Sequence, residues 1–143
     1  MKKTFGRLLV LASLVAAPLS VAQAETLRFH AMLSGAEEVP ATTSNGTGAV
    51  DASWDSTTMT LSWNGSYTGL TGAATGAHVH GPAAKGANAG VVVPIIAKDG
   101  KFSGSTKLAA SQAADLAAGK YYVNVHTAAH PDGEIRGQLT RAD

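Results

Sequence analysis

The sequence predicts an all-β fold, a Greek-key-like β-sandwich or barrel with one short helix. Three observations predict it. Short runs of alternating apolar and polar residues follow one another closely, 16 glycines and 5 prolines punctuate the 143 residues, and only one segment has helical character. Short strands at close spacing between turn signals are typical of β-sandwiches and barrels.

The first 24 residues have the features of a secretory signal peptide. Three cations, Lys2, Lys3 and Arg7, precede an apolar stretch at 8–17, and Ala22-Gln23-Ala24 matches a cleavage site. An apolar stretch of this length is too short to span a bilayer. We therefore expect a cleaved chain, no membrane span, and a periplasmic or secreted location.

The remaining residues, 25–143, are predicted to form one domain. They carry eight Lys and Arg against ten Asp and Glu, a net charge of −2, so nothing indicates the basic patch that a nucleic-acid partner requires. There is no cysteine, so the stability of this extracytoplasmic domain must come from packing rather than from disulfides.

The first half of the domain predicts four strands. In 27–33, Leu27, Phe29, Ala31 and Leu33 share one face, while Arg28, His30 and Met32 share the other. A loop of small and polar residues is expected at 34–45. The other three strands are expected at 48–54, at 58–63 with a possible extension through 66–70, and at 74–80, where Gly81-Pro82 ends the run.

The second half predicts four more strands and the helix. The β-branched run 91–96 is followed by the turn signal Asp99-Gly100 and a strand at 101–106. The helix is expected at 108–118, with Ser111 as a possible cap and Gly119 after its end. The last strands are expected at 120–127 and 134–140.

Alternation decides which way the histidines point. Val79 is the core residue between His78 and His80, so both histidines are predicted on the outer face of the sheet. The valines of 121–126 place His126 outward as well, together with Tyr122 and Asn124. His30 points outward from the first strand, and His130 lies in a turn.

The ordered motifs in this chain resemble the CHRD domain family, first described in chordin and widespread in bacterial secreted proteins. The matching stretches are Ala36-Glu37-Glu38-Val39-Pro40, His78-Val79-His80-Gly81-Pro82, Val123-Asn124-Val125-His126-Thr127, and the run from Pro131 to Leu139. The resemblance covers about 27–139 and implies an all-β domain. It implies no settled biochemical activity, and the growth-factor binding of chordin does not transfer with the fold.

The histidine pattern also resembles the copper site of copper/zinc superoxide dismutases, where His-x-His on one strand and a later histidine bind copper. The matching positions are His78, His80 and His126. The departures are substantial: this chain has no cysteine pair and no histidine between His80 and His126, where the bridging and zinc ligands would lie. A fourth copper ligand would have to be His30 or His130.

Metal binding competes with a plainer interpretation, in which His78, His80 and His126 face solvent from a polar strand surface. Imidazole suits copper, zinc and nickel, and two histidines two residues apart on a strand lie side by side. His30 is the next candidate, with Met32 as a possible ligand for Cu(I). His130 is more typical of a turn residue.

The remaining polar and aromatic residues favour structural roles. Glu134 and Arg136 are expected to form a surface ion pair or fix a strand end, with anion binding as the alternative. Glu37 and Glu38 are expected to be solvated. Trp54 and Trp63 are predicted to pack in the core or across strands. The three residue pairs therefore add no catalytic site.

The sequence thus predicts a secreted or periplasmic binding domain that holds a metal ion, copper above all, through surface histidines. The alternative is an extracellular module that binds a protein or a cell-surface polymer without metal. Superoxide dismutase-like redox chemistry is disfavoured because the dismutase loops are missing, so binding is favoured over catalysis.

Overall fold

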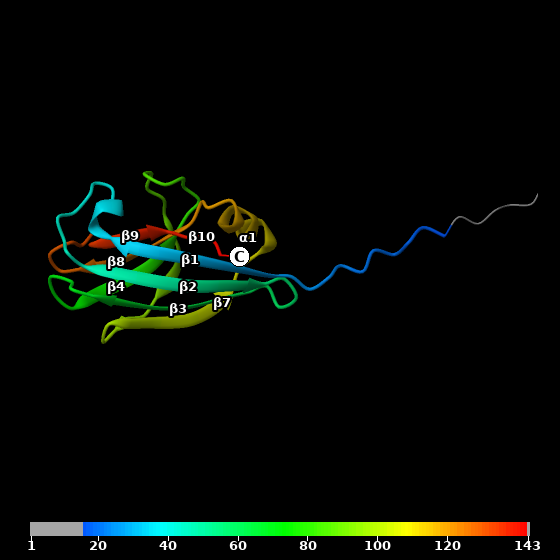
Figure 1. The fold of residues 1–143 in the computed structure, drawn as a ribbon, viewed down its shortest axis with the longest axis horizontal. Coiled ribbons are helices and arrows are strands. Elements are labelled where there is room, and N and C mark those ends of the chain that lie inside the picture. Colours follow the sequence, from blue (N-terminus) through cyan, green and yellow to red (C-terminus); the bar gives the residue numbers. More distant parts are fainter. Residues whose placement is uncertain (1–15, 143) are drawn as a thin grey trace, which may run out of the picture.

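The computed structural model describes residues 16–142. The predicted signal peptide, 1–24, lies mostly outside them, and its described part is exposed and has no regular secondary structure (Figure 1). The folded domain begins at β1 (Thr26–Ser34). Within the described residues, no helix is long and apolar enough to cross a membrane.

The strands form a single antiparallel sheet that curves into a nearly closed barrel, as predicted (Figure 1). The order across it is β5-β4-β8-β9-β1-β2-β3-β7-β6, and β10 pairs with β1. The strands after β1 are β2 (Thr47–Asp55), β3 (Thr60–Thr68), β4 (Ala74–His80), β5 (Val91–Ile95), β6 (Ala97–Lys98), β7 (Lys101–Lys107), β8 (Tyr122–Thr127), β9 (Ile135–Gln138) and β10 (Thr140–Arg141). Contacts of β4 with β6 and of β5 with β7 bring the two sheet edges together.

The core fills the barrel and follows the predicted alternation. Leu27, Phe29, Ala31 and Leu33 of β1 are all buried, whereas Arg28 and Met32 are exposed. The two tryptophans are buried as expected, and the indole nitrogen of Trp54 donates to the carbonyl oxygen of Leu108 at 3.0 Å. The core also contains Val50, Leu61, Ala77, Val79, Val93, Ile95, Phe102, Leu116, Val123, Val125, Ile135 and Leu139.

The helix α1 (Ala110–Ala117) closes one end of the barrel, with Leu116 fully buried. Gly119 follows it at a φ of +74°, the left-handed conformation that suits glycine after a helix end. The suggested cap at Ser111 was wrong: the helix starts one residue earlier, and the side chain of Gln112 accepts from the backbone N–H of Ala109. The predicted loop at 34–45 also contains a short 3₁₀ turn, η1 (Gly35–Glu37).

Most strand predictions are confirmed to within a residue or two, and the strand 74–80 matches in full. The structure differs from the strand predictions at two places. The expected strand 134–140 is divided into β9 and β10, because residues 135–138 pair with β8 while residues 140–141 pair with β1. The short strand β6, two residues long and paired with β7, was not predicted.

The segment between β4 and β5, residues 81–90, lies over the outer face of the sheet, and we call it the cover loop. The guanidinium of Arg136 on β9 donates to the carbonyl oxygen of Ala87 at 2.5 Å, and the amide of Gln138 donates to the carbonyl oxygen of Ala83 at 3.0 Å. The part of the outer face around Arg136 and Gln138 is therefore covered by the loop.

The close approach of β9 to β1 gives a testable requirement for glycine at 137. A Cβ built on Gly137 would lie 2.2 Å from the carbonyl oxygen of Met32, a backbone atom of β1 that has no freedom to move aside. We expect Gly137→Ala to lower the free energy of unfolding by about 2 kcal/mol, as overpacking does.

Urea denaturation measures this change, and Gly72→Ala is the matched control. Gly72 is exposed, and a Cβ there would meet nothing within 4 Å. Equal stabilities of the two variants would contradict the proposed strand contact.

Candidate metal centre

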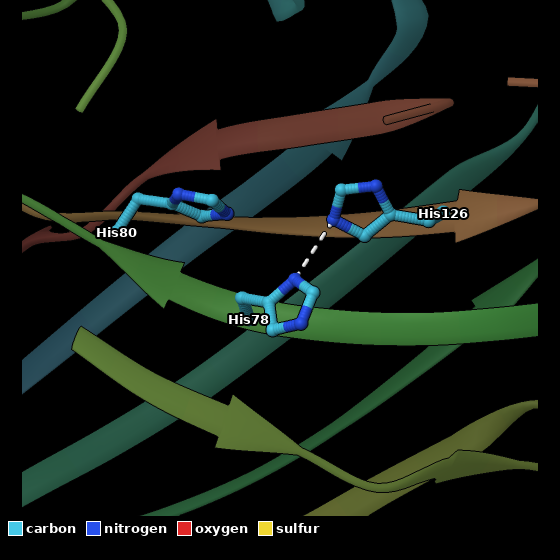
Figure 2. A group of neighbouring side chains, drawn as sticks. All are labelled: His78, His80 and His126. Carbon is cyan, nitrogen blue, oxygen red and sulfur yellow. Dashed lines mark hydrogen bonds between the residues drawn. The ribbon is translucent and has the colours of Figure 1, made fainter. Parts of the chain in front are cut away.

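Three histidines converge on the outer face of the sheet, as the alternation predicted. His78 and His80 extend from β4, and His126 extends from the neighbouring strand β8 (Figure 2). Each offers one ring nitrogen, and these three atoms lie within 4.8 Å of one another. Because His126 pairs with Gly76 and His78 pairs with Asn124, His78 and His126 are diagonal neighbours across the two strands, and His80 lies two residues further along β4.

The orientation of His126 is fixed by the turn that follows β8. Its Nδ1–H donates to the carbonyl oxygen of Pro131 at 2.9 Å, which leaves the lone pair on Nε2. That Nε2 lies 2.9 Å from Nδ1 of His78, which donates to it when no metal is bound (Figure 2). A carbonyl partner on the far nitrogen is the arrangement that orients metal-binding histidines.

His80 is more enclosed than the sequence indicated. It is only 9% exposed, because its ring stacks on Tyr122 with centroids 4.8 Å apart and the cover loop lies beside it. Its Nδ1 lies 2.9 Å from the carbonyl oxygen of Ala89, and its Nε2 lies 2.9 Å from the side-chain oxygen Oδ1 of Asn124. Both oxygens accept, so the neutral ring donates to one of them at a time, and the tautomer that donates to Ala89 leaves the lone pair on Nε2.

The surroundings favour the neutral form of His78 and of His80. Burial lowers the pKa of His78, and the neighbouring His126 and His80 lower it further. Burial also lowers the pKa of His80, outweighing the hydrogen bonds that the charged ring donates to the oxygens of Ala89 and Asn124, which raise the pKa. Because only the neutral ring has a lone pair to give, this environment favours metal binding over protonation.

The distances are compatible with one metal ion. At metal–nitrogen bonds of about 2.0 Å, two nitrogens stand about 2.8 Å apart at a right angle and about 3.3 Å apart in a tetrahedron. The 2.9 Å between His78 and His126 lies between these values. The largest separation, up to 4.8 Å, exceeds both values, so the His80 ring must move inward by about 1.5 to 2 Å and leave Asn124.

The other two candidate histidines lie outside this cluster. His30 on β1 makes a 2.8 Å contact through Nδ1 with Asp51 of β2, and Met32 on the same strand is 66% exposed. His130 lies in the predicted turn and lines a cleft between the loops 39–43 and 129–133. The structure thus groups His78, His80 and His126 and places the two supplementary candidates elsewhere.

The surface ion pair expected of Glu134 and Arg136 was wrong, because both side chains are buried. Glu134 accepts hydrogen bonds from Ser44, from Thr127, and from both the backbone and the hydroxyl of Thr71. Burial alone would raise its pKa, but these hydrogen bonds outweigh burial and lower the pKa to about 2.

The guanidinium of Arg136 stacks on an aromatic ring instead of forming the expected pair. Its central carbon lies 3.4 Å from the ring centroid of Tyr122, and its nitrogens donate to Asn88 at 2.8 Å and to Ala87. The ring of Tyr122 is itself buried, and its hydroxyl donates to Ala89 at 3.2 Å. Tyr122 therefore both packs under the cover loop and contacts His80 of the histidine cluster.

The two loop glutamates differ, although both were expected to be solvated. Glu37 forms a 2.9 Å ion pair with Lys85 and stays partly exposed. Glu38 is buried, and burial raises its pKa to about 7 against the lowering effects of Arg136, Asn124 and Val39. Its Oε1 makes no hydrogen bond within the described residues. Alternation cannot reveal this burial, because Glu38 lies in a loop.

Comparisons with known proteins agree with the fold and the motifs. The family model of the CHRD domain matches residues 29–139, a span that contains all three clustered histidines, Glu38 and Arg136. No curated protein and no solved structure matches the chain. Since the family model covers most of its length, the chain belongs to the CHRD domain family.

Proposed function

We propose that this protein is a secreted or periplasmic metal-binding protein that holds one copper ion at His78, His80 and His126. The observation that carries the proposal is the convergence of three imidazole nitrogens from two neighbouring strands, all within 4.8 Å. Two of the rings have their far nitrogen on a backbone carbonyl, which leaves the near one for the metal.

Copper is favoured over other ions by the chemistry of the donors. Imidazole nitrogens suit copper, zinc and nickel, and of these copper also has a monovalent state, which three neutral ligands can hold without an anionic group. Magnesium and calcium require oxygen ligands, and the cluster offers none. Binding, storage or delivery of copper is therefore the role that we propose.

Removal of one ligand tests the proposal. We expect the wild-type protein to bind one equivalent of copper. We expect His78→Ala to lose at least about tenfold in copper affinity, because mutation of a residue that only hydrogen-bonds to a metal ligand already lowers metal affinity by that factor. Equilibrium dialysis with metal analysis measures both numbers. His78 is half-exposed, so the substitution leaves the core intact.

Two histidine variants serve as matched controls. His30→Ala and His130→Ala each remove an imidazole from outside the cluster, so we expect wild-type stoichiometry and affinity in both. Unchanged copper binding in His78→Ala, or a loss of binding in His30→Ala equal to that in His78→Ala, would overturn the assignment.

A further inference from the structure

A buried positive charge lies beside the histidine cluster. The strand β8 runs between β4 and β9, so Tyr122 has His80 on one side and Arg136 on the other. The Tyr122 ring lies parallel to the His80 ring, at an interplanar angle of 2°, and the Arg136 guanidinium lies 3.4 Å from its centroid. Arg136 is only 2% exposed, so water screens its charge weakly.

This charge is incompletely compensated. Within the described residues, the guanidinium donates hydrogen bonds to the neutral oxygens of Asn88 and Ala87. The nearby acid is Glu38, and its burial keeps it protonated for half of the molecules at a pH near 7. A metal ion bound at the cluster therefore experiences net positive charge from this side.

The ligands supply no negative charge either. Among the described residues, the cluster consists of three imidazoles without a carboxylate or thiolate. Three neutral nitrogens satisfy a cuprous ion, which carries one charge and accepts two or three ligands. A cupric ion carries two charges and takes four or more ligands, so both the charge and the ligand number disfavour it.

We propose that the cluster selects cuprous over cupric ion, and that Arg136 strengthens this preference from behind Tyr122. The inference rests on the proposed copper site and names the oxidation state that it holds. Arg136 acts through space on the bound charge and is a positioning residue rather than a ligand.

The test measures two dissociation constants for the same protein. Cu(I) affinity is obtained without oxygen by competition with the chromogenic chelator bathocuproine disulfonate, and Cu(II) affinity by competition with nitrilotriacetate. We expect tighter binding of Cu(I) in the wild type. We expect Arg136→Gln to reduce the ratio of the two affinities about tenfold, because the fixed charge repels the divalent ion more strongly than the monovalent one.

Two further variants separate charge from structure. Arg136→Lys keeps the charge and is expected to keep most of the ratio. Glu38→Gln at pH 8 removes the negative charge that offsets Arg136, so we expect the preference for Cu(I) to increase, a change opposite in sign to that in Arg136→Gln. If circular dichroism shows that Arg136→Gln does not fold, the affinity ratio measured for Glu38→Gln still tests the proposal.

The outcomes distinguish failure of the Cu(I) preference from failure of the proposed copper site. Absence of binding for both ions in the wild type would overturn the copper site itself. Binding of copper at the cluster with Cu(II) held more tightly would overturn the selectivity alone. Tighter binding of Cu(I), at a ratio that neither Arg136→Gln nor Glu38→Gln changes, would overturn the contribution of Arg136.

Discussion

Replacement of Glu134 by Gln is expected to lower the free energy of unfolding at pH 7 by about 3 kcal/mol. The carboxylate is fully buried and takes hydrogen bonds from three segments: Ser44 before β2, Thr71 before β4 and Thr127 at the end of β8. It therefore joins three parts of one barrel end. A glutamine would place an N–H against donors that the carboxylate now satisfies.

The same contacts predict the acid stability of the wild type. The pKa of Glu134 falls from its ordinary 4.5 to about 2 on folding. Because the folded pKa is the lower one, the stabilisation is present in full above about pH 4.5 and is lost as the pH falls toward 2. We expect this share of the acid-induced loss, about 3 kcal/mol, to be absent from Glu134→Gln.

Urea denaturation of both proteins between pH 7 and pH 2 measures the difference, and Glu37→Gln is the matched control. Glu37 belongs to an exposed ion pair with Lys85, so we expect its removal to change stability by less than about 1 kcal/mol. Parallel acid profiles for Glu134→Gln and the wild type would show that the buried carboxylate does not stabilise the barrel in the way its contacts indicate.

The fold could be predicted from the sequence because two signals agree in this chain: the alternation of apolar and polar residues marks the strands, and the turn residues mark where the strands end. The strand β4 is bounded as predicted, since Val79 alternates with histidines and Gly81-Pro82 follows. The turn at Asp99-Gly100 is confirmed by positive φ angles at both residues, the conformation that a tight hairpin requires. Alternation also placed His78, His80 and His126 on one face, which is sufficient to predict that they lie near each other once β4 and β8 pair.

The alternation of apolar and polar residues could not predict which segment covers the outer face of the sheet. A period of two separates the inner side of a sheet from its outer side, but it does not show whether a loop lies over the outer side. The cover loop buries His80, Tyr122 and Arg136 through contacts far apart in sequence, such as that between Arg136 and Ala87. This burial made the predicted surface ion pair of Arg136 wrong and placed its charge beside the histidine cluster.

Copper bound at the histidine cluster is expected to stabilise the folded state against thermal unfolding. The three ligands come from β4 and β8, so an ion bound to all of them links two strands that must separate on unfolding. A ligand present at 100 times its dissociation constant stabilises the state that binds it by about 2.7 kcal/mol. A domain of this size would show this as an increase of several degrees in Tm.

Differential scanning calorimetry with and without copper, followed by addition of a strong chelator, measures this stabilisation and its reversal. His126→Ala is expected to lose most of the increase, whereas His30→Ala is expected to keep it, because His30 contacts Asp51 on another part of the barrel. Imidazoles of the unfolded chain also bind copper and reduce the effect, so His30→Ala and His126→Ala, with four histidines each, give matched unfolded states. An equal increase in the two variants would mean that copper binds the folded protein somewhere other than at His126.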